Sequence, residues 1–210
     1  FTLPFGNYEV SITVPEDHLV AATGTLQNPE EVLTKEQRKK LEEARDEREE
    51  PVIIVSEEYA RKNEQDKSSK KKTWKFAAEN VRDFAFASSR KYIWDAQAVK
   101  LANSSPLAMS FYPKEGNPLW ERESTLAIKN TLEVYSERTF DYPYPVAISV
   151  NAANQGMEYP MICFNYGRPD KDGNYSERTR DGNISVIVHE VGHNYFPMIV
   201  NSDERQWTWM

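Results

Sequence analysis

The spacing of the hydrophobic residues changes once along the chain, and this change limits the possible folds more than any other feature. Residues 8–14 alternate apolar and polar side chains, which is typical of a half-buried strand. Strand-like runs follow at residues 19–26, 51–55, 73–76, 83–88, 92–95 and 109–113. From Leu119 to Thr139 the apolar residues recur every three or four positions, as on a helix, before another strand at 146–150. We therefore predict an α+β fold, with a β-rich domain at residues 1–115 and an α+β domain at 116–210.

The composition excludes several classes of protein. Of 210 residues, 39% are hydrophobic, enough for a real core, and the net charge of −7 argues against nucleic acid as the main partner. Cys163 is the single cysteine, which rules out an internal disulfide framework and a thiolate-rich zinc cluster. No apolar run is long enough to predict a transmembrane segment, and the first residues do not resemble a signal peptide. Because the chain begins with Phe1, we expect it to be a piece of a longer polypeptide.

A strongly charged stretch interrupts the β-rich half at about residues 30–72. Thr34 and Gln37 fit a capping box, which predicts the start of a helix that continues to about Glu49. The helix has few apolar residues, so we interpret it as a solvated helix within an insertion.

The strongest functional signal is the segment His189-Glu190-Val191-Gly192-His193. On an α-helix, positions i and i+4 lie one turn apart on one face, so both imidazoles can bind the same zinc ion. Glu190 is placed to act as general base and acid on a water molecule activated by the metal. This spacing is the known metalloprotease pattern, although three fixed residues arise by chance in on the order of one sequence per hundred.

The helix prediction for this motif conflicts with local propensity. Residues 184–188 are mostly β-branched, and Gly192 costs about 1 kcal/mol inside a helix. Packing in a buried helix can outweigh both effects. Asp181 or Asn183 is the expected N-cap, and Pro197 is the expected stop.

The third zinc ligand is not evident from spacing. The subclass with a third histidine needs His at position 199 and Gly at 196, whereas this chain has Ile199 and Phe196. Asp203 and Glu204 follow His193 by only ten and eleven residues. That leaves little chain for a turn and a second helix, so neither is a strong candidate, and both remain open.

The segment 189–196, in which an aromatic pair follows the second histidine, resembles the zinc helix of the aminopeptidase N family of gluzincin metallopeptidases. Residues 201–210 resemble the approach to that family's third ligand, a glutamate that follows after eighteen intervening residues. The resemblance implies that this glutamate lies two positions beyond Met210 and that the transition-state tyrosine lies further downstream. It also implies a thermolysin-like catalytic domain, of which this chain would contain the first part.

Residues 155–159 are similar to the substrate-binding strand of the same family. The resemblance implies that Glu158 binds the free amino terminus of a peptide and that the backbone at Gly156 and Met157 pairs with substrate. Two positions differ from the family pattern, because Gln155 replaces glycine and Tyr159 replaces asparagine. Residues 8–24, 73–87 and 92–95 look like the later strands of the family's saddle-shaped amino-terminal β-domain.

The leading hypothesis is a zinc-dependent aminopeptidase that takes peptides as substrates, with this piece itself inactive. One alternative is a non-catalytic peptide-binding or scaffold relative, which the changes at Gln155 and Tyr159 support. Another is an endopeptidase that uses the same zinc helix. The resemblance leaves the compartment unknown, with the cell envelope or secretion as the expectation.

Overall fold

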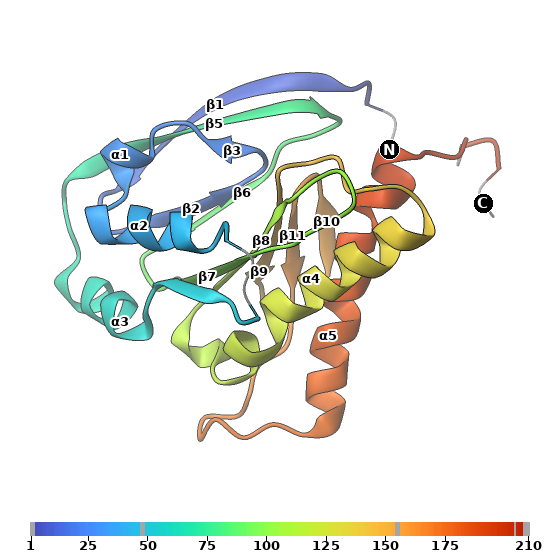
Figure 1. Cartoon of the computed structure of the whole chain (residues 1–210). Helices are drawn as coiled ribbons and strands as arrows, with labels where there is room; N and C mark the ends of the chain where they lie inside the picture. Colours follow the sequence, from blue (N-terminus) through green and yellow to red (C-terminus); the bar gives the residue numbers. More distant parts are fainter. Residues whose placement is uncertain (1–2, 47–48, 154–155, 204, 208–210) are drawn as a thin grey trace.

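The computed structural model describes residues 3–46, 49–153, 156–203 and 205–207, and it confirms the α+β class. Its strands are β1 (Gly6–Pro15), β2 (Leu19–Ala22), β3 (Thr25–Leu26), β4 (Val52–Val55), β5 (Lys71–Val81), β6 (Phe86–Ser89), β7 (Ile93–Ala98), β8 (Leu107–Tyr112), β9 (Val146–Asn151), β10 (Met157–Tyr159) and β11 (Ile162–Asn165). Its helices are α1 (Pro29–Val32), α2 (Lys35–Glu43), α3 (Glu57–Asp66), α4 (Leu119–Arg138) and α5 (Glu177–Gly192), with the short segments η1 (Lys114–Gly116) and η2 (Asn194–Ile199). Figure 1 shows their arrangement. None of the described helices is both long and apolar enough to cross a membrane.

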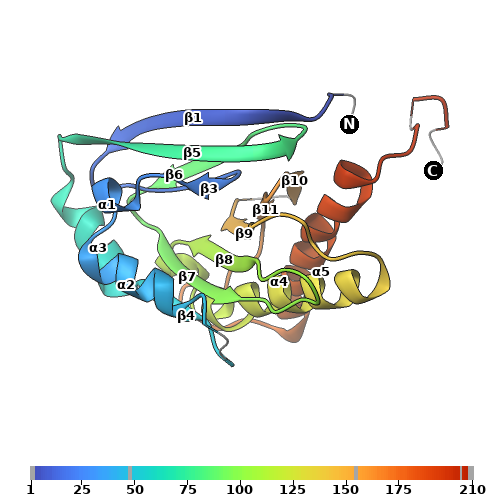
Figure 2. The same ribbon diagram turned by 45° about the horizontal axis from the view of Figure 1, so that its top comes forward.

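The first part of the chain forms a long antiparallel ribbon. β5 lies between β1 and β3, and β2 pairs with β6 in a separate two-stranded sheet. Side chains alternate between the two faces of the ribbon, and this alternation determines which face is turned to the core. The buried face carries Ile12 and Val14 of β1 and Trp74 and Phe76 of β5. Figure 2 shows this ribbon lying over one end of the larger sheet.

A six-stranded mixed sheet forms the centre, in the order β10-β11-β9-β8-β7-β4. β8, β9 and β11 run parallel, and the flanking strands β10, β7 and β4 are antiparallel to their neighbours. β8 precedes the predicted boundary at residues 115/116 and β9 follows it, so one sheet contains strands from both predicted domains.

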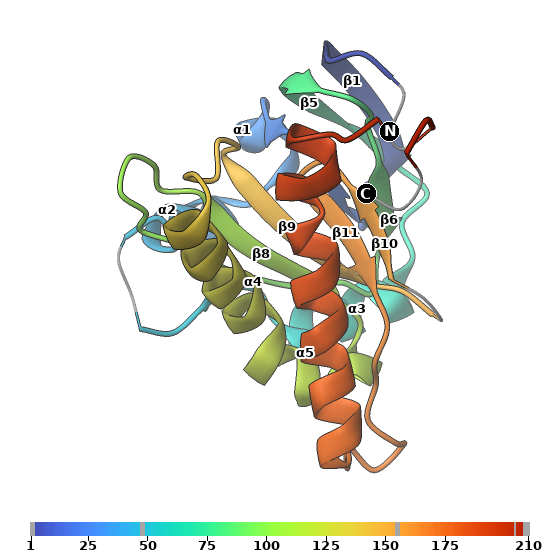
Figure 3. The same ribbon diagram turned by 90° about the vertical axis from the view of Figure 1, so that its right-hand side faces the viewer.

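Helices α4 and α5 pack against each other on one face of this sheet, as Figure 3 shows. α4 begins and ends within one residue of its predicted range, 119–139. α5 begins earlier than predicted, because the Ser176 side chain accepts a hydrogen bond from the Thr179 N–H and caps it. The predicted caps are therefore wrong: Asp181 lies inside the helix, and buried Asn183 donates to the Tyr166 carbonyl.

The charged stretch contains more regular structure than the sequence indicates. The capping box of Thr34 and Gln37 is present, as predicted, but α2 ends at Glu43 rather than near residue 49. Residues 52–55 form β4, as the strand-like run at 51–55 predicts, and it lies at the edge of the central sheet, beside β7. A further helix, α3, follows the N-cap Ser56 and was not predicted.

Candidate metal centre

The last turn of α5 brings the two histidines of the motif together. His189 and His193 lie one turn apart, and their Nε2 atoms are 3.0 Å from each other. Their rings meet edge to face, with centroids 4.5 Å apart. A carboxylate oxygen of Glu190 joins these nitrogens in a group whose donor atoms all lie within 4.8 Å of one another. The geometric expectation for the motif, two imidazoles converging on one face of a helix with a carboxylate beside them, matches this arrangement.

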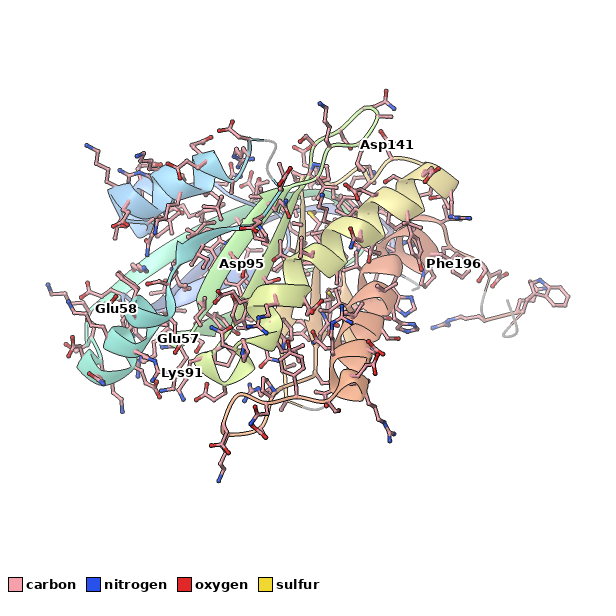
Figure 4. The ribbon with its side chains drawn as sticks, turned by 60° about the horizontal axis from the view of Figure 1, so that its bottom comes forward. Glu57, Glu58, Lys91, Asp95, Asp141 and Phe196 are labelled. Atoms are coloured by element: carbon pink, nitrogen blue, oxygen red, sulfur yellow. The ribbon has the colours of Figure 1, made fainter. Side chains whose placement is uncertain are left out.

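The donor set suits a zinc ion. Ligands at 2.0–2.1 Å from a tetrahedral zinc lie about 3.3 Å apart, close to the spacing of the two imidazole nitrogens. His193 Nδ1 lies 3.2 Å from the Phe196 carbonyl oxygen, an interaction that orients the ring as metal-binding histidines require. Figure 4 marks Phe196, which follows the end of α5.

Neither nearby acidic residue completes this set among the residues that the structure describes. Asp203 is exposed and does not belong to the group around His189 and His193. Glu204 lies outside the described residues. The glutamate implied by the resemblance would lie beyond Met210.

Glu190 lies in a desolvated position beside the histidines. The residue is 5% exposed, and within the described part of the chain its Oε2 atom has no hydrogen-bond partner. Burial raises the pKa of Glu190; the imidazoles of His189 and His193 counteract this rise, and the hydrogen-bonded carboxylate of Glu158 adds to it. A raised pKa makes the carboxylate a stronger proton acceptor, which suits a general base.

Strand β10 brings the predicted substrate-binding residues to this centre. It is the edge strand of the central sheet, where Glu158 pairs with Cys163 of β11. Because the Glu158 and Glu190 carboxylates interact, the two predicted functional glutamates face each other. Met157 is 43% exposed at the same edge. Gln155, one of the two positions that differ from the family pattern, lies outside the described residues.

Gly156 packs directly against the Glu190 carboxylate. A Cβ atom at this position would lie 2.0 Å from Glu190 Oε1 and 2.7 Å from Val186 Cγ2. Real Cβ atoms do not make contacts this short, so a side chain here would displace Glu190 or the strand. The family resemblance implies substrate contacts for Gly156 but does not reveal this close approach to α5.

Asn194 ties the end of α5 to the turn between β10 and β11, a role that sequence reasoning missed. The side chain is buried, its Oδ1 atom accepts a hydrogen bond of 2.9 Å from the Met161 N–H, and its Nδ2 donates to the Val191 carbonyl. Met161 lies in the turn between β10 and β11 with φ at +64°. In the sequence, the only indication of this role was the presence of an amide residue directly after the second histidine.

Comparison with known proteins supports the fold. The sequence matches no protein-family model and no curated protein. The structure is similar to that of the M1 zinc metallopeptidase from Deinococcus radiodurans, with a TM-score of 0.59 and 14% identity over 94% of this chain and 36% of the other. A point mutant of that enzyme bound to a Tyr-Ser-Ala substrate gives a TM-score of 0.54 at 16% identity, with the same coverage of both chains.

These similarities concern the fold alone, because the identities are low. The chain spans about a third of the length of the solved structures that it matches (36%). M1 peptidases are the family of aminopeptidase N, so the neighbours agree in fold with the resemblance drawn from the motifs. This chain therefore has an α+β fold that resembles part of an M1 zinc metallopeptidase.

Proposed function

We propose that this chain is part of a zinc-dependent metallopeptidase in which His189 and His193 hold the metal. The observation that carries the proposal is the convergence of the two Nε2 atoms, 3.0 Å apart, beside the buried Glu190 carboxylate. The fold of its M1 neighbours supports it. A glutamate outside this chain completes the metal site, as the resemblance implies.

The proposed mechanism divides the work between the metal and the protein. A zinc ion bound there supplies a Lewis acid that polarises the scissile carbonyl and makes a water molecule more acidic. Glu190 accepts the proton of that water and later delivers it to the leaving amine. Its desolvated position favours this exchange, because burial raises the pKa of the carboxyl group.

We further propose that the enzyme is an aminopeptidase. Glu158 supplies a carboxylate for the substrate's ammonium group, and the outer edge of β10 offers backbone groups to which an extended peptide can add as a strand. The interaction of Glu158 with Glu190 supports this assignment, because the anchored amine then lies within one residue of the scissile bond.

The Glu190→Gln variant tests the catalytic assignment in a longer form of the protein that includes the third ligand. Hydrolysis of an amino-terminal amide reporter should fall by about 10²–10⁴-fold, with zinc content unchanged, because the amide cannot accept the proton. Glu177→Gln, an exposed substitution at the start of the same helix, is the matched control and should leave turnover intact. Undiminished turnover in Glu190→Gln would refute the assignment.

Comparing a peptide with its amino-terminally acetylated form separates the aminopeptidase from the alternatives. An aminopeptidase cleaves only the free form, and Glu158→Gln should raise its KM. An endopeptidase cleaves both forms equally. A scaffold relative shows no metal-dependent hydrolysis of either peptide.

The chain on its own should bind zinc weakly and be inactive, because two neutral imidazoles provide much less affinity than three protein ligands. Tight binding of one zinc ion per chain would contradict this expectation. It would reopen Asp203 and Glu204 as candidate ligands.

A further inference from the structure

An apolar cavity of about 310 Å³ lies between the long β-ribbon and the central sheet, far in sequence from the zinc helix. This volume is at the lower end of the range for small-molecule sites, about 300–1,000 Å³. Its main contributors are Trp74 and Phe76 of β5, Trp94 of β7, Met109 and Phe111 of β8, and Leu41 of α2. Figure 2 shows the ribbon on one side of this region, β7 and β8 on the other, and α2 at the edge.

The central sheet separates this cavity from the helices on its other face. Along β8, Met109 and Phe111 line the cavity, whereas Ser110 between them hydrogen-bonds to Ser124 of α4 at 2.7 Å. In β7, Trp94 lines the cavity and Asp95 binds the Thr125 hydroxyl of α4. Because side chains alternate across a sheet, the cavity lies on the face opposite α4 and α5.

Two polar donors in this apolar lining are unsatisfied. The indole N–H groups of Trp74 and Trp94 are buried, and neither has a hydrogen-bond partner among the described residues. The rings are otherwise well packed, since Trp74 stacks on Phe76 and Trp94 stacks on Phe111. A buried N–H without an acceptor is costly, so the two indole groups mark polar positions within the apolar lining.

Two arginines, Arg38 of α2 and Arg45 just after the end of that helix, give the cavity an electropositive edge. Arg38 is partly buried and donates to the carbonyls of Glu30 and Leu33, which fixes its guanidinium beside the cavity. Arg45 is more exposed, and among the described residues it makes a loose acidic contact of 3.8 Å with Glu42. Two guanidinium groups and one carboxylate therefore border an otherwise apolar space, a pattern that complements an anionic head on an apolar body.

We propose that this cavity binds a medium-chain monocarboxylate, with its alkyl chain between the two tryptophan–phenylalanine stacks and its carboxylate toward Arg38 and Arg45. This site is separate from the proposed peptidase centre, and it does not depend on that function. The apolar lining supplies most of the affinity, so each CH₂ group that enters tightens Kd by about fourfold until the cavity is full.

Two-dimensional ¹H–¹⁵N NMR of the tryptophan indoles tests the site in this chain, with decanoate as the probe. The Nε1–H signals of Trp74 and Trp94 should shift saturably with decanoate. Trp120 is an internal control, because its Nε1–H donates to the Gly167 carbonyl at 2.7 Å, and its signal should stay fixed. Hexanoate should bind more weakly than decanoate, and acetate and decylamine should produce no shift.

A pair of arginine variants tests the head-group assignment without altering the core. Arg45→Gln should weaken decanoate binding by about three- to fivefold, the effect expected of an exposed charge. Arg61→Gln on α3 is the matched control, because Arg61 pairs with Glu57 as Arg45 pairs with Glu42, and its side chain is similarly exposed, 55% against 54% for Arg45. Unshifted Trp74 and Trp94 signals, equal binding of decylamine, or equal affinity in Arg45→Gln would each overturn the proposal.

Discussion

At the scale of single residues, the contact between Gly156 and Glu190 links the start of β10 to the carboxylate that we propose as the general base. The strand approaches so closely that no side chain fits between them, since a Cβ at position 156 would lie 2.0 Å from Glu190 Oε1. Glu158, two residues further along, interacts with the same carboxylate. The position of Glu190 is therefore set from two sides, by its own helix and by β10.

Gly156→Ala should impair catalysis without removing the metal ligands. The added methyl group pushes the Glu190 carboxylate away, so kcat/KM should fall by about tenfold or more while zinc content stays unchanged. Gly6→Ala in β1 is the control, because the nearest atom to its added Cβ is 4.0 Å away. Steady-state kinetics of the longer protein measure the effect, and unchanged kcat/KM in Gly156→Ala would contradict it.

At the scale of elements, α5 shows how packing overrides propensity. Its β-branched run and Gly192 oppose helix formation, yet Val186, Ile187 and Val191 are buried against the sheet and α4. Packing explains why a glycine is present at position 192, because a Cβ there would lie 2.9 Å from the Tyr135 hydroxyl of α4. The glycine permits close contact between α4 and α5 at the position directly before His193.

Replacing either of two glycines of α5 with alanine should change the free energy of unfolding, but in opposite directions. Gly192→Ala gains about 1 kcal/mol of helix propensity but forces Tyr135 to move, and overpacking costs about 1–3 kcal/mol, so the free energy of unfolding should fall. Gly182→Ala has nothing within 4 Å of its added Cβ, so the free energy of unfolding should rise by about 0.5–1 kcal/mol. Urea denaturation of both variants measures these changes. A stabilising Gly192→Ala would contradict the packing argument.

Elements with a clear hydrophobic period were predictable from the sequence, and the others were not. The alternation in residues 8–14 and the three-to-four spacing from Leu119 lie within β1 and α4. α3 was not predicted because Ala60 is its one buried residue, so the sequence has no apolar stripe that indicates a helix there. The start of α5 was misplaced because Ser176, Asp181 and Asn183 are all good capping residues, and tertiary contacts decide among them. Within the candidate site, spacing was enough to predict the histidine pair, whereas the Gly156 and Asn194 contacts depend on strand placement.

At the scale of the whole molecule, the central sheet joins parts of the chain that sequence periodicity separates. β7, β8 and β9 are buried on both faces, so they lack the alternation that would reveal their partners. Their pairing places Asp95 beneath α4, where Figure 4 labels it and where it is 1% exposed. It accepts hydrogen bonds from the hydroxyls of Tyr112 and Thr125. Burial raises the pKa of Asp95 to about 7, although these two hydrogen bonds oppose the rise.

Asp95 should make the stability of the fold pH-dependent. Between about pH 4 and pH 7 the unfolded chain ionises this group while the folded chain keeps it protonated, so stability falls as pH rises. Above pH 7 the loss is complete, and a difference of about three pKa units corresponds to on the order of 4 kcal/mol. Asp95→Asn should reduce this slope, since an amide does not titrate, its oxygen still accepts from one hydroxyl and its NH₂ group can donate to the other. Urea denaturation at pH 5 and pH 8 measures the slope, and an equal slope in both proteins would contradict the assignment.

The central claim is that His189 and His193 hold a catalytic zinc ion, and anomalous X-ray diffraction at the zinc edge tests it most directly. Crystals of the longer protein should show one strong peak about 2.0–2.1 Å from the Nε2 atoms of both residues. A glutamate from beyond Met210 should provide the third protein ligand. A zinc peak elsewhere in the protein, or a histidine pair with no peak in zinc-saturated crystals, would contradict the claim.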